Sequence, residues 1–315
     1  MATARSYERI LFLGVFAATM LGLGGGAVGQ ARRDPGAFDN GVAYTFERKF
    51  ATRTVNDAYD HGSISLATYI WRPLAQNRHE VVLLSHGSLG GIALDPHEPI
   101  PFVAPQLIEF LVRRGYTVVQ PTRRGLGEST GTFVEECAYV AGKCSLAEYR
   151  ARAEPGLAEA IRDSNAVIDQ IIEGQEVPRG SKLLFAGISR GGFLSLRMAA
   201  ERPELCKGVI NFVGGWLSVT GDWPPEENSA RQALADEWFR SAGTRAHAPT
   251  IWIYASRDPY YSESTTRRFF EQFRKGGGTG EYVFVADHSL SIGHRVASEP
   301  KLWDTKVDAF LHALN

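Results

Sequence analysis

Short apolar runs alternate with amphipathic segments along most of the chain. Two early runs, 42–50 and 63–71, alternate between apolar and polar residues with a period of two. This pattern predicts antiparallel strands at the edge of a sheet. The later runs are mostly apolar and short, as expected of strands that are buried on both faces. They cover residues 80–87, 116–121, 183–186, 208–216, 250–258 and 281–287.

The amphipathic segments between these runs predict helices. The clearest helix covers residues 156–174, where four apolar residues share one face and a glycine suits the end; these are Leu157, Ile161, Ile168, Ile172 and Gly174. Similar patterns cover residues 105–116, 193–200, 265–278 and 301–314. Strands that alternate with helices predict an α/β domain with a mostly parallel sheet, helices on both faces and an antiparallel N-terminal edge.

Three segments fall outside this alternation. Residues 30–40 are expected to form a flexible lead-in to an α/β domain at 41–315. Residues 132–154 have no clear period and are predicted to be irregular. Residues 217–247 contain two tryptophans and a Pro224-Pro225 break, so we interpret them as a small lid insertion or a long connection.

The N-terminus has the order of a secretory signal peptide. Arg5 and Arg9 precede an apolar stretch from Ile10 to about Leu23, and small residues follow, with Gln30 after the expected cut. We therefore expect residues 1–29 to be removed, the protein to be secreted or periplasmic, and no stable membrane span to remain. A retained membrane anchor is the alternative, but the apolar stretch is short for a membrane span.

Composition and charge narrow the possible partners. The 315-residue chain has a formal net charge of -1, which gives no long-range reason to bind nucleic acid. The sequence contains neither HExxH nor a Cys/His cluster, so we expect no metal. In an oxidising compartment, Cys137 and Cys144 are expected to close a short disulfide loop and to leave Cys206 as a packed thiol.

The segment LLFAGISRGGFLSL, residues 183–196, places a serine between two glycines where a strand is predicted to end and a helix to begin. Gly187-Ile188-Ser189-Arg190-Gly191 fits the nucleophile-elbow pattern G-x-S-x-G. Glycine lets the two segments approach closely around a strained Ser189, whose hydroxyl would lie at a helix N-terminus. A Gly/Ser turn without chemistry is the alternative, and the flanking strand and helix favour the elbow.

A serine hydroxyl needs a base, and the base needs a group that orients it. The order associated with the elbow is Ser, then Asp or Glu, then His, and Asp258 follows a predicted strand. Two histidines come later, His288 and His294; we expect His294 to be the base because it follows Gly293 and precedes the last helix. A turn or helix-cap role for Asp258 and a surface-loop role for His294 are the alternatives.

The oxyanion hole requires backbone N–H donors. We expect these to come from Arg190, directly after the nucleophile, and from Ser88, in the loop after the strand at 80–87. His86 and Gly87 shape that loop, and His86 is expected to be structural. The Arg190 side chain either binds an acidic substrate group or is a solvated or salt-bridged surface arginine.

The chain resembles the α/β-hydrolases, and among them the dienelactone hydrolase family and its prolyl-oligopeptidase-like relatives. The resemblance rests on LLSHGSLGG, GYTVVQPTRRGLGEST, the elbow segment, IYASRDPYY and SIGHR. It implies Ser189 as nucleophile, Asp258 as acid, His294 as base and hydrolysis without a cofactor. Serine stands where dienelactone hydrolases have cysteine, and Thr122 stands where relatives often have aspartate.

The leading hypothesis is an exported serine hydrolase that cleaves a small or medium carboxylic ester through an acyl-enzyme on Ser189. A serine exopeptidase or amidase of the prolyl-oligopeptidase-like type is a second enzyme hypothesis. A non-catalytic α/β-hydrolase-like binding protein is the third. In the two enzyme hypotheses the partner is a small-molecule ester or amide substrate.

Overall fold

The computed structural model describes residues 34–39, 41–75, 77–88, 104–133, 146–217, 219, 225–287 and 290–314. These residues belong to one compact unit of the chain. The expected signal peptide, the Cys137–Cys144 pair and His288 lie outside the described residues. Cys206 is described and is a free, buried thiol, and its burial raises its pKa to about 12.

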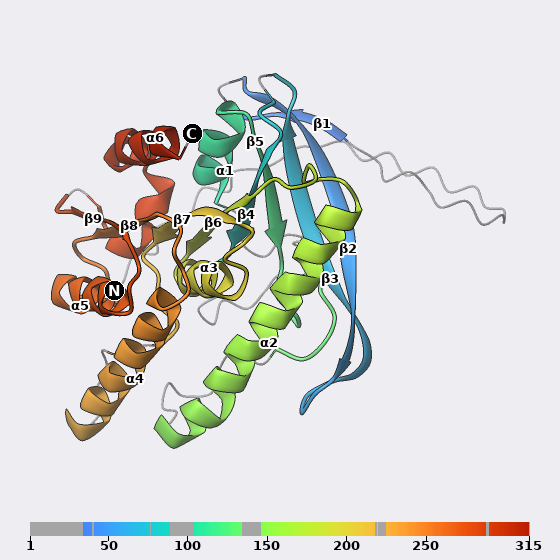
Figure 1. The fold of residues 1–315 in the computed structure, drawn as a ribbon. Coiled ribbons are helices and arrows are strands. Elements are labelled where there is room, and N and C mark those ends of the chain that lie inside the picture. Colours follow the sequence, from blue (N-terminus) through green and yellow to red (C-terminus); the bar gives the residue numbers. More distant parts are fainter. Residues whose placement is uncertain are drawn as a thin grey trace, which may run out of the picture. The chain divides into compact units, whose positions relative to one another are not determined.

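A nine-stranded sheet in the order β1-β2-β3-β5-β4-β6-β7-β8-β9 forms the centre of the fold (Figure 1). The first three neighbouring pairs in this order, β1–β2, β2–β3 and β3–β5, are antiparallel. The remaining pairs, β5–β4, β4–β6, β6–β7, β7–β8 and β8–β9, are parallel. The predicted fold class, a mostly parallel sheet with an antiparallel N-terminal edge, is therefore confirmed. The strands are β1 (Asp34–Ala37), β2 (Ala43–Asn56), β3 (His61–Pro73), β4 (Glu80–Ser85), β5 (Tyr116–Pro121), β6 (Leu183–Ile188), β7 (Cys206–Phe212), β8 (Thr250–Ala255) and β9 (Gly280–Val285).

Helices cover both faces of the sheet. In Figure 1, α1 and α6 lie on one side, and α2, α3, α4 and α5 lie on the other. Their bounds are α1 (Pro105–Arg113), α2 (Leu146–Glu173), α3 (Arg190–Glu201), α4 (Pro225–Gly243), α5 (Glu263–Lys275) and α6 (Asp304–Ala313), with short 3₁₀ helices η1 (Gly293–Ser298) and η2 (Pro300–Leu302) before α6. Trp303 links the α1–α6 side to the sheet, because its ring packs edge-on against Phe110 of α1 and Phe212 of β7.

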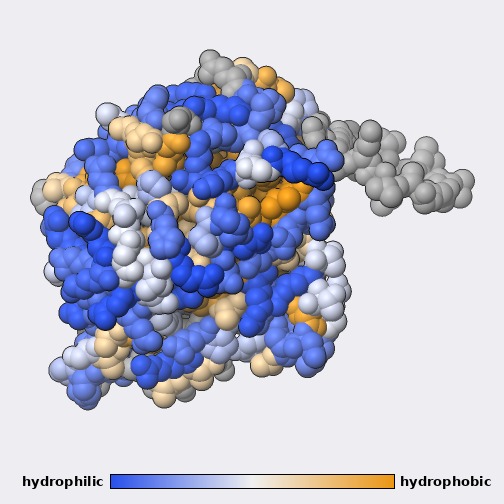
Figure 2. All heavy atoms as spheres, viewed as in Figure 1, coloured by the Kyte–Doolittle hydropathy of each residue, from blue (hydrophilic) through white to orange (hydrophobic). Residues whose placement is uncertain are grey.

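The burial of the strands explains the apolar runs of the sequence. All residues of β5, β6 and β8 are buried, whereas β2 repeatedly alternates between buried and more exposed positions. The face of the molecule in Figure 2 is accordingly mostly hydrophilic, with separate apolar patches. Strand burial therefore accounts for the apolar runs, whereas in β2 the buried positions include Glu47 and Phe50 is exposed.

Two elements differ from the sequence prediction. The expected flexible lead-in at 30–40 contains β1, which pairs with β2 through backbone hydrogen bonds. Phe38, directly after β1, packs on Tyr44 with ring centroids 4.5 Å apart. The segment expected to be irregular, 132–154, contains the first turns of α2, which begins at Leu146 and continues through Pro155. Proline normally ends a helical pattern, so the sequence placed the start of this helix ten residues too late.

The segment interpreted as a lid or long connection, 217–247, contains α4. The inner face of α4 is buried and includes Leu234, Trp238 and Phe239. Phe239 stacks on Phe269 of α5 at a centroid distance of 4.3 Å and lies edge-on to Phe193 of α3 at 4.7 Å. This helix is thus part of the layer that covers the sheet.

Candidate active site

Ser189 lies in a strained turn between β6 and α3. Its backbone angles are φ 57° and ψ -123°, a conformation that costs a non-glycine residue about 1–3 kcal/mol. Hydrogen bonds hold the turn: Ser189 N donates to Phe212 O over 2.9 Å, and Ser189 O accepts from the N–H groups of Gly192 and Gly215. The G-x-S-x-G segment therefore has the strained strand-to-helix geometry that the sequence predicts.

Gly187 and Gly191 make this turn possible. A Cβ on Gly187 would lie 2.1 Å from Gly191 O, and a Cβ on Gly191 would lie 2.0 Å from Ser85 O. No side chain fits at either distance, so β4, β6 and α3 can approach one another this closely only with glycine at both positions.

Asp258 and His294 are in direct contact. His294 Nδ1 lies 2.8 Å from Asp258 Oδ2, although the two residues are 36 positions apart. Asp258 Oδ1 accepts the backbone N–H groups of Tyr260 and Tyr261, over 2.8 and 3.2 Å. The Asp258 side chain is only 1% exposed, against 16% for His294. One carboxylate oxygen thus shapes the turn after β8, and the other holds the imidazole.

Gly293 brings the His294 segment onto the end of β8. Its N–H donates to Arg257 O over 3.1 Å, and a Cβ at this position would lie 2.0 Å from Ser256 O. The backbone at the start of η1 is therefore packed directly on the Asp258 loop. The Tyr260 ring lies edge-on to the His294 ring at a centroid distance of 4.6 Å.

His86 is buried in the loop after β4. Its Nε2 accepts the backbone N–H of Arg123 over 3.1 Å, and its Nδ1 lies 2.7 Å from Gly87 O. This arrangement fits a neutral ring with the proton on Nδ1. Burial, and then the charge of Arg123, hold the pKa of His86 well below its ordinary value. His86 therefore has the structural environment that was expected, and Ser88 is half-buried at the end of the described part of this loop.

The Arg190 side chain lies over the buried ring of Trp216. Its guanidinium carbon is 5.7 Å from the ring centroid, which is a cation–π distance. Arg190 is also the first residue of α3, so its backbone N–H belongs to the N-terminal turn of that helix.

Sequence reasoning missed Arg123 and Arg124, which follow Thr122 in the turn after β5. Arg123 is 5% exposed and donates to two backbone carbonyls, His86 O over 2.5 Å and Gly87 O over 2.9 Å. The signal that was available in the sequence is the position of the two arginines, directly after a strand that is predicted to be buried. An arginine at such a position can be buried, and a buried arginine is almost always paired, so the position indicates partners for these side chains.

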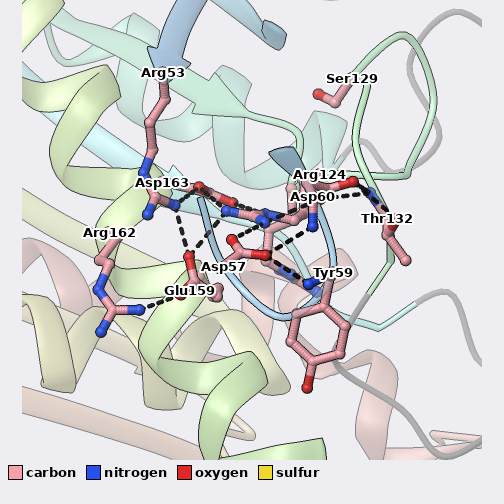
Figure 3. Close-up of polar contacts among 12 residues, drawn as sticks. Arg53, Asp57, Tyr59, Asp60, Arg124, Ser129, Thr132, Glu159, Arg162 and Asp163 are labelled. Carbon is pink, nitrogen blue, oxygen red and sulfur yellow. Dashed lines mark hydrogen bonds and ion pairs between the residues drawn. The ribbon is translucent and has the colours of Figure 1, made fainter. Parts of the chain in front are cut away.

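Arg124 lies at the centre of a buried cluster of charges (Figure 3). Its guanidinium donates to Asp163 Oδ2 over 2.7 Å, to Asp57 Oδ2 over 2.8 Å, to Glu159 Oε2 over 3.0 Å and to Asp60 Oδ2 over 3.1 Å. Arg53 pairs with the same Glu159 and Asp163 from β2. The cluster joins the turn after β5 to α2 and to the β2–β3 hairpin.

This cluster keeps the Asp57 carboxylate charged. Burial raises the pKa of Asp57, but hydrogen bonds from Arg124 and from the N–H groups of Asp60 and Tyr59 outweigh it and hold the pKa well below its ordinary value.

Within the described ranges, no group of three or more His, Cys, Asp or Glu residues has a metal-binding arrangement. The helices described here include none that is long and apolar enough to cross a membrane.

Neither a protein-family model nor a curated protein matches the sequence. Solved structures do match. An esterase of Pyrococcus furiosus is 18% identical with a TM-score of 0.56, over 85% of this chain and 90% of that chain. A Klebsiella pneumoniae protein described as a dienelactone hydrolase is 14% identical with a TM-score of 0.51, over 84% and 97%. An acylaminoacyl peptidase is 14% identical with a TM-score of 0.52, over 85% of this chain and 46% of its own.

The sheet order, the strained turn after β6 and these likenesses together define the fold. The chain has the α/β-hydrolase fold, as its resemblance in sequence implied. At these identities the likeness concerns the fold, and function has to be argued from the site.

Proposed function

We propose that the protein is a serine hydrolase that cleaves a small or medium carboxylic ester through an acyl-enzyme on Ser189. The observation that carries the proposal is the His294–Asp258 contact at 2.8 Å in a fold whose β6 ends at the strained Ser189. β6 and β8 are parallel and are separated only by β7, so Ser189 and Asp258 follow strands that end at the same edge of the sheet. Sites of open α/β sheets lie at this edge.

In the proposed reaction, the Ser189 hydroxyl oxygen attacks the ester carbonyl and His294 Nε2 takes its proton. Asp258 Oδ2 accepts the hydrogen bond from Nδ1–H of His294, which leaves Nε2 unprotonated and ready to act as base. The bond to the alcohol then breaks, and His294 returns the proton to the leaving oxygen. A water molecule, activated by the same histidine, hydrolyses the acyl-enzyme and restores the Ser189 hydroxyl.

The backbone N–H groups of Arg190 and Ser88 are the proposed oxyanion-hole donors. Arg190 begins α3, so the positive end of that helix lies at Ser189 and favours the negative charge that develops on the carbonyl oxygen. Gly191 packs against the backbone of Ser85 and His86, which supports the proximity of the Ser88 loop to the same helix turn.

A second candidate is an amidase or exopeptidase, because one similar structure is that of an acylaminoacyl peptidase. A panel of p-nitrophenyl esters with increasing acyl chains, assayed beside aminoacyl p-nitroanilides, separates the two. The ester proposal expects kcat/KM to be highest on an ester of short or medium chain. Higher kcat/KM on an aminoacyl anilide would favour the peptidase, and no turnover of either class would favour a binding protein.

We expect His294→Ala to lower ester hydrolysis by about 10³-fold or more, because the proton of Ser189 would have no acceptor. His288→Ala is the matched control and is expected to keep a substantial part of the activity. Both variants should be assayed on the best ester of the panel, with thermal unfolding to check that they fold. The reverse pattern would move the base to His288.

Export is a further part of the proposal. We propose that residues 1–29 are a signal peptide and that the mature protein begins at Gln30, because charged, apolar and small residues follow one another in the order of a cleavable signal. Intact mass measurement of the protein from its native host should give a chain that starts near Gln30 outside the cytoplasm. A cytoplasmic chain that retains residues 1–29 contradicts export.

A further inference from the structure

We propose that Arg123 is a positioning residue, which sets the direction of the Ser88 N–H in the oxyanion hole. This inference rests on the proposed function. The Arg123 guanidinium is buried under the loop after β4, and its two terminal nitrogens donate to consecutive carbonyls of that loop. The distances are 2.5 Å to His86 O and 2.9 Å to Gly87 O.

The planar peptide bond converts this contact into control of an N–H group. The carbonyl of Gly87 and the N–H of Ser88 belong to one peptide unit, and in a trans unit the C=O and N–H bonds point in opposite directions. Gly87 O is held toward Arg123 Nη2 and toward His86 Nδ1, at 2.9 and 2.7 Å. The Ser88 N–H must therefore point away from Arg123.

The loop that carries this N–H lies against the elbow. A Cβ on Gly191 would lie 2.0 Å from Ser85 O and 2.5 Å from His86 O, so the first turn of α3 is in contact with the backbone of the loop. Gly87 has no side chain whose contacts could fix the orientation of the peptide units on either side of it. A rotation of the Gly87–Ser88 peptide unit would remove the donor from the oxyanion hole while leaving Ser189, Asp258 and His294 in place.

Arg123 is itself held in position from both sides. Its own backbone N–H donates to His86 Nε2 over 3.1 Å, which closes a reciprocal set of contacts between the two residues. The next residue, Arg124, is bound by four carboxylates from α2 and from the β2–β3 hairpin (Figure 3). The tandem arginines thus connect the loop after β4 to α2 and to the β2–β3 hairpin: Arg123 binds the loop and Arg124 binds the carboxylates.

The fork of an arginine suits this task better than a lysine. Two donors in one plane can bind two neighbouring carbonyls at once, whereas a lysine ammonium on its flexible stem orients them less strictly. Arg123→Lys keeps the positive charge and removes the fork, and Arg123→Met removes both. The pair therefore separates orientation of the loop from the presence of a charge beneath it.

The test compares catalysis with stability. Both variants are expected to lower kcat on the best ester by about 10- to 10³-fold with little change in KM, because an oxyanion donor acts mainly in the transition state. Affinity for a trifluoromethyl ketone with the same acyl chain, which forms a tetrahedral oxyanion on the serine, should fall in parallel with kcat/KM. The matched control is Arg231→Met on α4, whose side chain is only 2% exposed and pairs with Glu227. It should lose stability and keep kcat and ketone affinity.

Two results overturn the inference alone. One is wild-type kcat and ketone affinity, within about twofold, in both Arg123 variants while the wild-type protein hydrolyses esters. The other is a loss in both variants that only follows the fraction of folded protein, as expected of Arg231→Met. Wild-type protein that neither hydrolyses the panel nor reacts with a fluorophosphonate overturns the proposed function as well, so the two failures are distinguishable. If Arg123→Met does not fold, the Arg123→Lys comparison carries the test.

Discussion

Ser189→Ala is expected to lower ester hydrolysis by about 10³-fold or more, the loss typical of removing a triad nucleophile. Alanine cannot form the acyl-enzyme, and the residual rate would come from binding and the oxyanion donors alone. The substitution should leave the fold intact, because the turn is held by the backbone contacts of Ser189 with Phe212, Gly192 and Gly215. Steady-state kinetics on the best ester, with thermal unfolding of the same samples, measures both effects.

Ser195→Ala is the matched control for this prediction. Ser195 lies on α3, the helix that follows Ser189, is also buried, and donates its hydroxyl to Ala186 O over 2.8 Å. Its loss should cost about 1 kcal/mol of stability and leave turnover nearly unchanged. If Ser189→Ala kept most of its turnover, the nucleophile would have to be sought elsewhere in the chain.

Arg124→Leu is expected to reduce the free energy of unfolding by about 3–5 kcal/mol, because it leaves a group of buried carboxylates without their central partner. The Arg124 side chain is 2% exposed and contacts Asp57, Asp60, Glu159 and Asp163. Urea unfolding at pH 7 measures the loss. Arg113→Leu is the control: Arg113 pairs with Glu109 on the surface of α1, and such exposed pairs contribute about 0–1 kcal/mol.

The pH dependence tests whether charge is the cause. A carboxylate with a lowered pKa in the folded state stabilises the fold fully above its unfolded pKa, which is about 4. This contribution declines as the pH falls below about 4 and is gone below the folded value. Asp57 has such a lowered pKa. The stability difference between wild type and Arg124→Leu should therefore shrink as the pH is lowered from about 7 to 3. A constant difference over this range contradicts the ion-pair explanation.

Most of the sheet could be predicted from the sequence because burial on both faces leaves a strong local signal. The runs that became β5, β6 and β8 are mostly apolar and buried throughout, and β2 alternates between buried and more exposed positions. β1 and the start of α2 left no such signal. β1 is held by backbone pairing with β2, which any short extended segment can make. A proline normally marks the boundary of a helix, so the sequence did not indicate that α2 continues through Pro155.

The elbow could be predicted for a similar reason: Gly187, Ser189 and Gly191 are neighbours in sequence, and the turn they form is local. The contacts of Arg123 and Arg124 could not be predicted. Their partners lie elsewhere in the chain, in the loop at 86–87, in the turn at 57–60 and on α2 at 159–163. Only the folded chain brings these groups together. For Asp258 the sequence offered a turn role and a triad role as alternatives, and the folded chain combines the turn contacts with the His294 contact.

Covalent labelling with a fluorophosphonate tests the central claim most directly. The reagent forms a stable ester with an activated serine, and peptide mapping by mass spectrometry locates the adduct. The proposed function expects one phosphonate on the peptide that contains Ser189, with labelling strongly reduced in His294→Ala and absent in Ser189→Ala. Folded wild-type protein with no adduct, or with its adduct on a different residue, contradicts the assignment of Ser189 as the nucleophile.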